Sequence, residues 1–234
     1  MIRTLAAGLF YAAMIPLGAL VFFPWTLLTG KIDVLYRFGM NVTRAGVRIA
    51  GVRVETRGLD RLDLGRNYIF MANHASNADP PILIPALPRR TSVLVKKELF
   101  RIPLLGRAML MASLVPIDRR NKEAAIASVR KAADVIRSGL DMTVFPEGTR
   151  TRDGRLLPFK KGPFHMAMET GTPIVPVTIL GTYEIQPKGR LRVAPGTVTL
   201  VFHEPVDPRD VADRDALIAR VRAAITSALP EERR

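Results

Sequence analysis

Seven short apolar runs, separated by helical patterns, dominate the chain from about residue 52. The runs have the length and composition of buried strands, and they cover residues 52–57, 67–72, 92–96, 113–117, 142–146, 173–179 and 197–203. Three helical patterns stand out, over 122–141, 162–171 and 213–229. Strands that alternate with helices are typical of α/β proteins. The sequence therefore predicts an α/β fold with a mixed, largely parallel sheet of about seven strands flanked by helices.

The first thirty residues carry no charged side chain between Arg3 and Lys31. If these 27 uncharged residues were wholly helical, they would extend about 40 Å, against about 30 Å for the hydrocarbon core of a bilayer. Pro16 and Pro24 each remove a backbone donor and tend to kink or end a helix. One kinked transmembrane helix and a helical pair embedded in one leaflet both fit this pattern. A cleaved signal peptide and a buried core helix fit it less well.

The next segment, over residues 32–51, has the pattern of a basic amphipathic helix. Arg37, Arg44 and Arg48 fall on one side of it, and apolar side chains fall on another. Such a helix beside an apolar anchor is typical of an interfacial element that faces anionic headgroups, although an ordinary surface helix has the same pattern. We expect an N-terminal membrane-associated segment over 1–50 and an α/β domain over 51–234. The basic residues after Lys31 favour the cytoplasmic face of the cell membrane for that domain.

The composition favours an anionic partner. Lys and Arg number 35 against 21 Asp and Glu, for a net charge of +14. Nucleic acid is not the expected partner, because only 6% of the residues are aromatic and no nucleic-acid-binding motif is present. The chain has no Cys, which excludes disulfides, thiolate nucleophiles and zinc–thiolate sites. An anionic membrane surface or a phosphorylated substrate fits better.

The stretch FMANHASNADPPIL places His74 two residues after a predicted strand and Asp79 five residues further on. Across a strand-to-helix turn, a carboxylate that accepts a hydrogen bond from Nδ1–H leaves Nε2 of the imidazole as a base. No protein nucleophile accompanies the pair, and Ser76 is better placed to stabilise the turn. Direct activation of a substrate hydroxyl fits, and it is worth about 10²–10⁴ in rate. A capping Asp and a turn His are the alternative.

Two further polar segments follow predicted strands. In FPEGTR, Gly148 permits close backbone approach, and Thr149 and Arg150 can donate hydrogen bonds to an anion; a polar turn with a pair between Glu147 and Arg150 is the alternative. In VPIDRRN, Arg119 belongs to an arginine pair that either clamps a phosphate or is solvated. Because ligands bind at the carboxyl ends of strands in open α/β sheets, these segments are expected to face one cleft.

Metal and cofactor chemistry is not expected. No second His or carboxylate stands at ligand spacing from His74. The sequence also has no P-loop and no dinucleotide fingerprint. We therefore expect no cofactor and no metal.

Four motifs, in order over residues 73–180, resemble those of the glycerolipid acyltransferase family, of the lysophosphatidic acid acyltransferase type. The family's N-H-x-x-x-x-D motif corresponds to Asn73, His74 and Asp79. Its second motif corresponds to KKELFRIPLLG followed by PIDRR, and its third, FPEGTR, is present unchanged. Its apolar, proline-containing motif corresponds to TPIVPVTI. Four motifs in the right order form a specific signal, whereas the first motif alone would be a weak one.

The resemblance implies a membrane-associated enzyme that moves a fatty acyl group from acyl-CoA or acyl carrier protein to the free hydroxyl of 1-acylglycerol 3-phosphate, giving phosphatidic acid. It implies His74 and Asp79 as catalytic residues, and as acceptor-binding residues Arg119, Glu147, Gly148, Thr149 and Arg150. The implied partners are membrane lipids and the acyl donor, which is a co-substrate. Glycerol 3-phosphate or another lysolipid, such as a lyso-ornithine lipid, remains open as acceptor. A non-catalytic protein that binds anionic lipid is the alternative from another class.

Overall fold

The structure is a computed structural model, and it describes residues 1–118 and 121–234. Over these residues, seven strands form one sheet in the order β1-β7-β6-β2-β5-β3-β4. The strands are β1 Val52–Arg57, β2 Ile69–Ala72, β3 Thr91–Lys96, β4 Val115–Ile117, β5 Asp141–Val144, β6 Ile174–Leu180 and β7 Gly196–Phe202. Neighbouring strands pair in parallel, except β6 with β7. The prediction of a mixed, largely parallel sheet of seven strands is confirmed.

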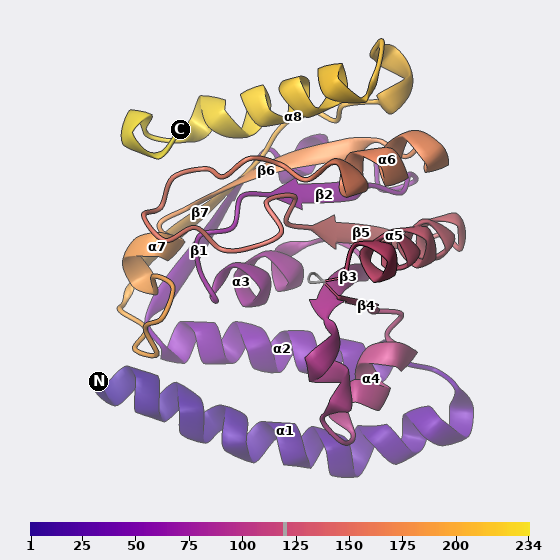
Figure 1. The fold of residues 1–234 in the computed structure, drawn as a ribbon. Helices are drawn as coiled ribbons and strands as arrows, with labels where there is room; N and C mark the ends of the chain where they lie inside the picture. Colours follow the sequence, from indigo (N-terminus) through magenta and orange to yellow (C-terminus); the bar gives the residue numbers. More distant parts are fainter. Residues whose placement is uncertain (119–120) are drawn as a thin grey trace.

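Helices cover both faces of this sheet (Figure 1). The α-helices are α1 Ile2–Thr29, α2 Asp33–Ile49, α3 Asp79–Ala86, α4 Leu105–Met111, α5 Lys122–Arg137, α6 Lys161–Thr170, α7 Thr182–Ile185 and α8 Arg214–Ala228. Short 3₁₀ helices are η1 Leu59–Arg61, η2 Lys97–Arg101, η3 Pro208–Asp210 and η4 Glu231–Arg233. The predicted helix over 122–141 ends at Arg137 because Gly139, with φ +94°, turns the chain into β5.

The central strand β2 separates two apolar layers. Its side chains alternate between the faces of the sheet, as in any strand. Ile69 and Met71 join the layer that contains α5, α6 and α8, and Phe70 and Ala72 join the layer of α2 and α3. All four are fully buried. A strand buried on both faces reads as a continuous apolar run in the sequence, which explains why this one was predictable.

The N-terminal segment is a helical hairpin of α1 and α2. Helix α1 continues through Pro16 and Pro24, so the prediction that these prolines tend to end the helix is not met. A Cβ on Gly18 would lie 2.2 Å from the ring of Phe38 on α2, so the two helices touch there and a larger residue would require this ring to move.

Helix α1 is long and apolar enough to cross a membrane. Only 11% of its most apolar window is buried inside the protein, so the alternative of a buried core helix is wrong. On α2, the side chains of Arg37, Arg44 and Arg48 are exposed, as predicted. The hairpin ends at Ile49 and β1 begins at Val52. The division into domains 1–50 and 51–234 stays a prediction.

Candidate active site

The site forms where the carboxyl ends of β2 and β5 meet. These strands are parallel neighbours, with Met71 opposite Val144. The chain therefore places His74, just after β2, beside Phe145, just after β5. The two rings stack, with centroids 4.2 Å apart and 25° between their planes. This aromatic contact holds the plane of the imidazole.

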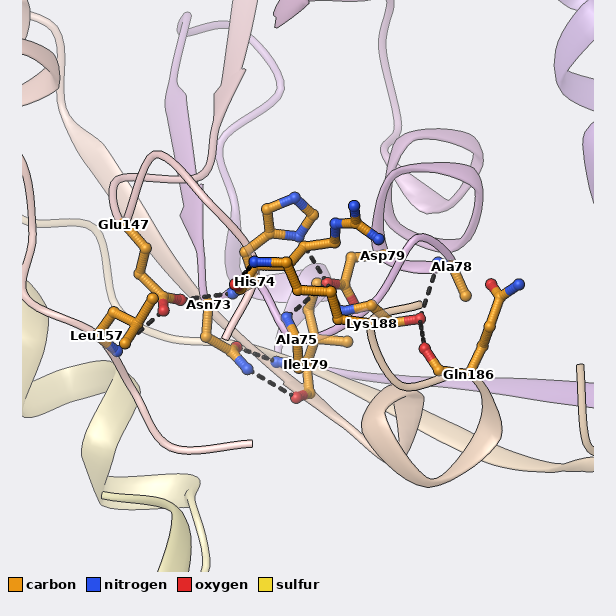
Figure 2. A network of polar contacts seen from close by, with 12 residues as sticks. Asn73, His74, Ala75, Ala78, Asp79, Glu147, Leu157, Ile179, Gln186 and Lys188 are labelled. Atoms are coloured by element: carbon orange, nitrogen blue, oxygen red, sulfur yellow. Dashed lines mark hydrogen bonds and ion pairs between the residues drawn. The ribbon is translucent and has the colours of Figure 1, made fainter. Parts of the chain in front are cut away.

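The imidazole of His74 is paired with the carboxylate of Asp79. Nδ1 of His74 lies 2.8 Å from Oδ2 of Asp79, and a dashed line in Figure 2 marks this contact. The same oxygen accepts hydrogen bonds from the backbone N–H groups of Ala75 and Ser76, each at 2.8 Å, and Asp79 is fully buried. A carboxylate with this partner requires the proton on Nδ1, so Nε2 of a neutral His74 carries the lone pair. The five-residue spacing works because a tight turn leads directly into α3.

Two polar side chains fix this turn to the rest of the sheet. Asn73 donates to the carbonyl of Ile179 at 3.0 Å and accepts from the N–H of the same residue at 2.7 Å. Its amide thus extends the ladder between β2 and β6 by one step. Ser76 donates to the carbonyl of Gln186 at 2.6 Å and accepts from the N–H of Ala78 at 2.9 Å. The turn is therefore held from two sides, by β6 and by the segment after α7, which limits the motion of His74.

The carboxylate of Glu147 points into the protein. Oε1 accepts from the backbone N–H of His74 at 2.6 Å, and Oε2 accepts from that of Leu157 at 2.9 Å. The side chain belongs to a residue only 2% exposed, and this burial raises the pKa of Glu147 to about 7. Among the described ion pairs, none joins Glu147 to Arg150. In this geometry Glu147 positions His74, and its direct contact with an acceptor stays a prediction.

The three residues after Glu147 lie on the loop that borders the His74 turn. Gly148 takes φ +72°, a conformation that suits glycine, and Thr149 is exposed. Nη1 of Arg150 is buried and has no hydrogen-bond partner among the described residues. The N–H of Thr151 donates to the carbonyl of His74 at 3.0 Å. The loop backbone therefore contacts the His74 turn, and the loop carries a guanidinium with one nitrogen that has no partner among the described residues.

Arg119, the remaining predicted site residue, lies outside the described residues. It follows β4, whose carboxyl end belongs to the same edge of the sheet as that of β2. Its contact with the acceptor stays a prediction.

Two basic residues at the site were not identified from the sequence. Nζ of Lys188 donates to the carbonyl of Arg150 at 3.0 Å, and the adjacent Pro187 forms a bridge with Ser76 of the turn (Figure 2). Arg222 on α8 donates to the carbonyl of Leu157 at 3.0 Å, behind Glu147. Both residues stand more than a hundred positions from His74 along the chain, and no local spacing signals such contacts.

The arrangement offers a base, a backing carboxylate and cations. Among the described residues, no group of three or more His, Asp or Glu side chains is placed to hold a metal ion. A neutral imidazole with a buried carboxylate behind it can accept a proton from a hydroxyl. Arg150 and Lys188 add positive charge at the same turn. The geometry suits a hydroxyl substrate with an anionic group near that hydroxyl.

Comparison with known proteins links this geometry to one family. The model of the Acyltransferase family matches residues 53–180. The 1-acyl-sn-glycerol-3-phosphate acyltransferase of Limnanthes douglasii is 37% identical over 188 residues, which are 80% of this chain and 66% of that protein. The corresponding protein of Cocos nucifera is 37% identical over 169 residues, which are 71% of this chain and 55% of its own length. The chain thus spans no more than two thirds of the length of these plant relatives.

A solved structure matches nearly the whole fold. The crystal structure of the 1-acyl-sn-glycerophosphate (LPA) acyltransferase from Thermotoga maritima gives a TM-score of 0.79 at 30% sequence identity. The match covers 97% of this chain and 94% of that one. The likeness therefore includes the N-terminal hairpin as well as the sheet.

Proposed function

Because the chain belongs to the acyltransferase family, we propose that it transfers a fatty acyl group from a thioester to the free hydroxyl of 1-acylglycerol 3-phosphate. The product is phosphatidic acid, and the step belongs to phospholipid biosynthesis. The donor is acyl-CoA or acyl carrier protein, which acts as a co-substrate. No metal ion and no organic cofactor enters the proposed steps.

The observation that carries the proposal is the pair of His74 and Asp79. The 2.8 Å contact between Nδ1 and Oδ2 leaves Nε2 as the basic nitrogen, and the stacking on Phe145 fixes its direction. Burial of Asp79 behind the ring stabilises the imidazolium that forms when Nε2 takes a proton. Such a base needs no protein nucleophile when the substrate itself supplies the attacking oxygen.

The proposed reaction proceeds in two steps. Nε2 of His74 takes the proton of the acceptor hydroxyl while the oxygen attacks the thioester carbonyl, which gives a tetrahedral intermediate. The carbon–sulfur bond then breaks, and the imidazolium returns its proton to the leaving thiolate. The products are the new ester and a free thiol, and His74 is again neutral.

Basic residues near the turn would hold the phosphate of the acceptor. Arg150 has a buried nitrogen without a hydrogen-bond partner in the part of the chain that the structure describes, and guanidinium groups bind phosphate oxygens well. Lys188 lies at the same turn and adds a second cation. We include the backbone at Gly148 and the side chains of Thr149 and Arg119 in this proposed phosphate site, on the family resemblance.

The N-terminal hairpin would hold the enzyme at the membrane. Helix α1 exposes a long apolar surface, and α2 carries exposed arginines. We propose attachment at the cytoplasmic face of the cell membrane, as a monotopic or single-span protein. An attached enzyme reaches an acceptor that is itself embedded in the leaflet.

The test is a panel of acceptors and donors with the purified full chain. The acceptors are 1-acylglycerol 3-phosphate, glycerol 3-phosphate, a lyso-ornithine lipid and monoacylglycerol, each with acyl-CoA and with acyl carrier protein, and mass spectrometry reads the products. We expect 1-acylglycerol 3-phosphate to be acylated fastest. His74→Ala should lower the rate by about 10²–10⁴, whereas His165→Ala, on the exposed surface of α6, should not.

Two results would contradict the proposal. If activity survives in His74→Ala, the assignment of His74 as the base is wrong. If no acceptor is acylated with either donor, while the protein still binds anionic lipid, the non-catalytic alternative is correct.

A further inference from the structure

Five large apolar side chains are exposed on the segment that joins β3 to β4. They lie on η2, α4 and the turn between them, and they are between 42% and 57% exposed: Leu99, Ile102, Leu104, Leu105 and Leu110. We call residues 97–111 with these side chains the apolar lip. Single exposed apolar side chains are common, but five on one short segment indicate an interaction surface.

Leu104, at the tip of the apolar lip, has an unusual backbone. Its φ is +62° with ψ −51°, which is costly for a residue with a Cβ, by about 1–3 kcal/mol. Its side chain gains little burial in return, because the residue is 53% exposed. A strained backbone that presents a leucine outward has no evident purpose within the folded chain. An external apolar partner would give it one.

The apolar lip lies at the same edge of the sheet as His74. Helix η2 follows the carboxyl end of β3 directly, and β3 and β2 both pair in parallel with β5, on its two sides. Figure 1 shows η2 and α4 extending from this edge to the level of α1. In this view the apolar lip and α1 reach the same end of the molecule.

Basic side chains accompany the apolar lip. Arg101 and Arg107 are exposed on it, and Lys96 and Lys97 stand at its start, where they pair with Glu98 and Asp118. Apolar side chains flanked by Lys and Arg are typical of elements that insert between anionic headgroups. Charge complementarity thus favours a lipid surface over a neutral protein surface as the occupant.

We infer that the apolar lip inserts into the bilayer surface as a second membrane contact, separate from the N-terminal hairpin. Leu104 and its neighbours enter the headgroup region, and Arg101 and Arg107 contact anionic lipids. This contact brings the carboxyl edge of the sheet against the leaflet. If the proposed function holds, the acceptor then moves from the leaflet to His74 without crossing water.

Tryptophan fluorescence at a single position tests this insertion directly. Trp25 on α1 is the only tryptophan, so Trp25→Phe gives a background into which Leu104→Trp is introduced. The matched control is Met168→Trp, at a 38% exposed position on α6, which packs on the opposite face of the sheet from α2. Each protein is reconstituted into phosphatidylcholine–phosphatidylglycerol vesicles whose acyl chains carry bromine, a quencher.

We expect the tryptophan at position 104 to lose most of its fluorescence and to shift to the blue, and the one at 168 to do neither. Quenching of wild-type Trp25 alone, with position 104 unquenched, would overturn the inference. A second copy of the chain is the other candidate occupant. If position 104 is shielded in lipid-free detergent solution and sedimentation shows a dimer there, that copy covers the apolar lip and the inference is wrong.

A second variant guards against misfolding. Leu104→Gly removes the side chain, and glycine adopts φ +62° without strain, so the variant is expected to fold at least as well. Acylation is measured once with acceptor embedded in vesicles and once with a short-chain soluble acceptor. The rate with the embedded acceptor, divided by the rate with the soluble one, should fall in Leu104→Gly and not in Met168→Gly. An unchanged ratio would contradict the role in acceptor delivery. If the wild type acylates nothing, the proposed function fails, yet the tryptophan result still decides whether the apolar lip inserts.

Discussion

Replacement of Glu147 by glutamine separates its structural contribution from its effect on catalysis. The carboxylate accepts one buried N–H on each oxygen, from His74 and from Leu157. A glutamine offers one oxygen and one NH₂ group, so one buried N–H faces another donor, at a cost of about 1–3 kcal/mol. The variant no longer buries a charge, however. For the wild type at pH 8, a pKa raised from 4.5 to about 7 corresponds to roughly 3 kcal/mol of burial cost. The two effects oppose each other, so Glu147→Gln should change the free energy of unfolding little at pH 8.

The difference in unfolding free energy between the wild type and Glu147→Gln changes with pH in a defined direction. Because the folded pKa of Glu147 lies above its unfolded value, the stability that its protonated form contributes is complete below about pH 4.5 and is lost as the pH rises through about 7. Glutamine has no such dependence. Between pH 8 and pH 5.5 the wild type should therefore gain about 2 kcal/mol relative to Glu147→Gln. Urea unfolding of both proteins in detergent, at both pH values, measures this difference.

Glu147→Gln should have a lower kcat even at the pH where its stability equals that of the wild type. Because a glutamine cannot accept from both N–H groups, its side chain and the turn that it supports shift, and a displacement of about 1 Å can cost about 10² in rate. At pH 8 we expect a much lower kcat with a nearly unchanged KM for the acceptor. Glu123→Gln, at an exposed position on α5, serves as the control. A Glu147→Gln protein that keeps its kcat, or whose stability difference from the wild type does not depend on pH, would refute this reasoning.

Three further predictions concern residues around the site and the hairpin. Lys188→Ala should raise the KM for a phosphate-bearing acceptor and leave the KM for monoacylglycerol unchanged. Lys131→Ala, on the exposed surface of α5, should change neither KM, and steady-state kinetics measures both values. Asn73→Ala leaves two buried backbone groups of β6 unpaired, at about 1–3 kcal/mol each, and a lower urea midpoint measures the loss. Gly18→Val places side-chain atoms where the ring of Phe38 lies, so the hairpin should open, and faster proteolysis of the loop between α1 and α2 in detergent would report it.

Much of the sheet was predictable because its strands are buried on both faces. Such strands appear as apolar runs bounded by turn residues, and all seven were located from the sequence. The contact of His74 with Asp79 was also accessible, because both residues belong to one turn. The continuous α1 was not, since the packing of Gly18 against Phe38 that accompanies it depends on a second helix.

The roles of Glu147 and Lys188 could not be predicted for a different reason. Beside Gly, Thr and Arg, a glutamate reads as a surface residue, and its true partners are backbone N–H groups that leave no trace in the sequence. Lys188 meets the turn only through a loop that follows β6. The short α4 also escaped prediction, because a helix of this length between two strands has too few residues to show a period.

The hydrogen bonds around His74 also constrain the order in which the molecule assembles. Helices α1 and α2 contact each other over a short separation along the chain, and such local contacts form quickly. The turn at His74 instead depends on Glu147, Leu157, Ile179 and Gln186, which emerge from the ribosome much later. The hairpin can therefore reach a membrane while the imidazole still lacks its supports. With the attachment proposed above, an unfinished chain would be tethered to the membrane before its active site is complete.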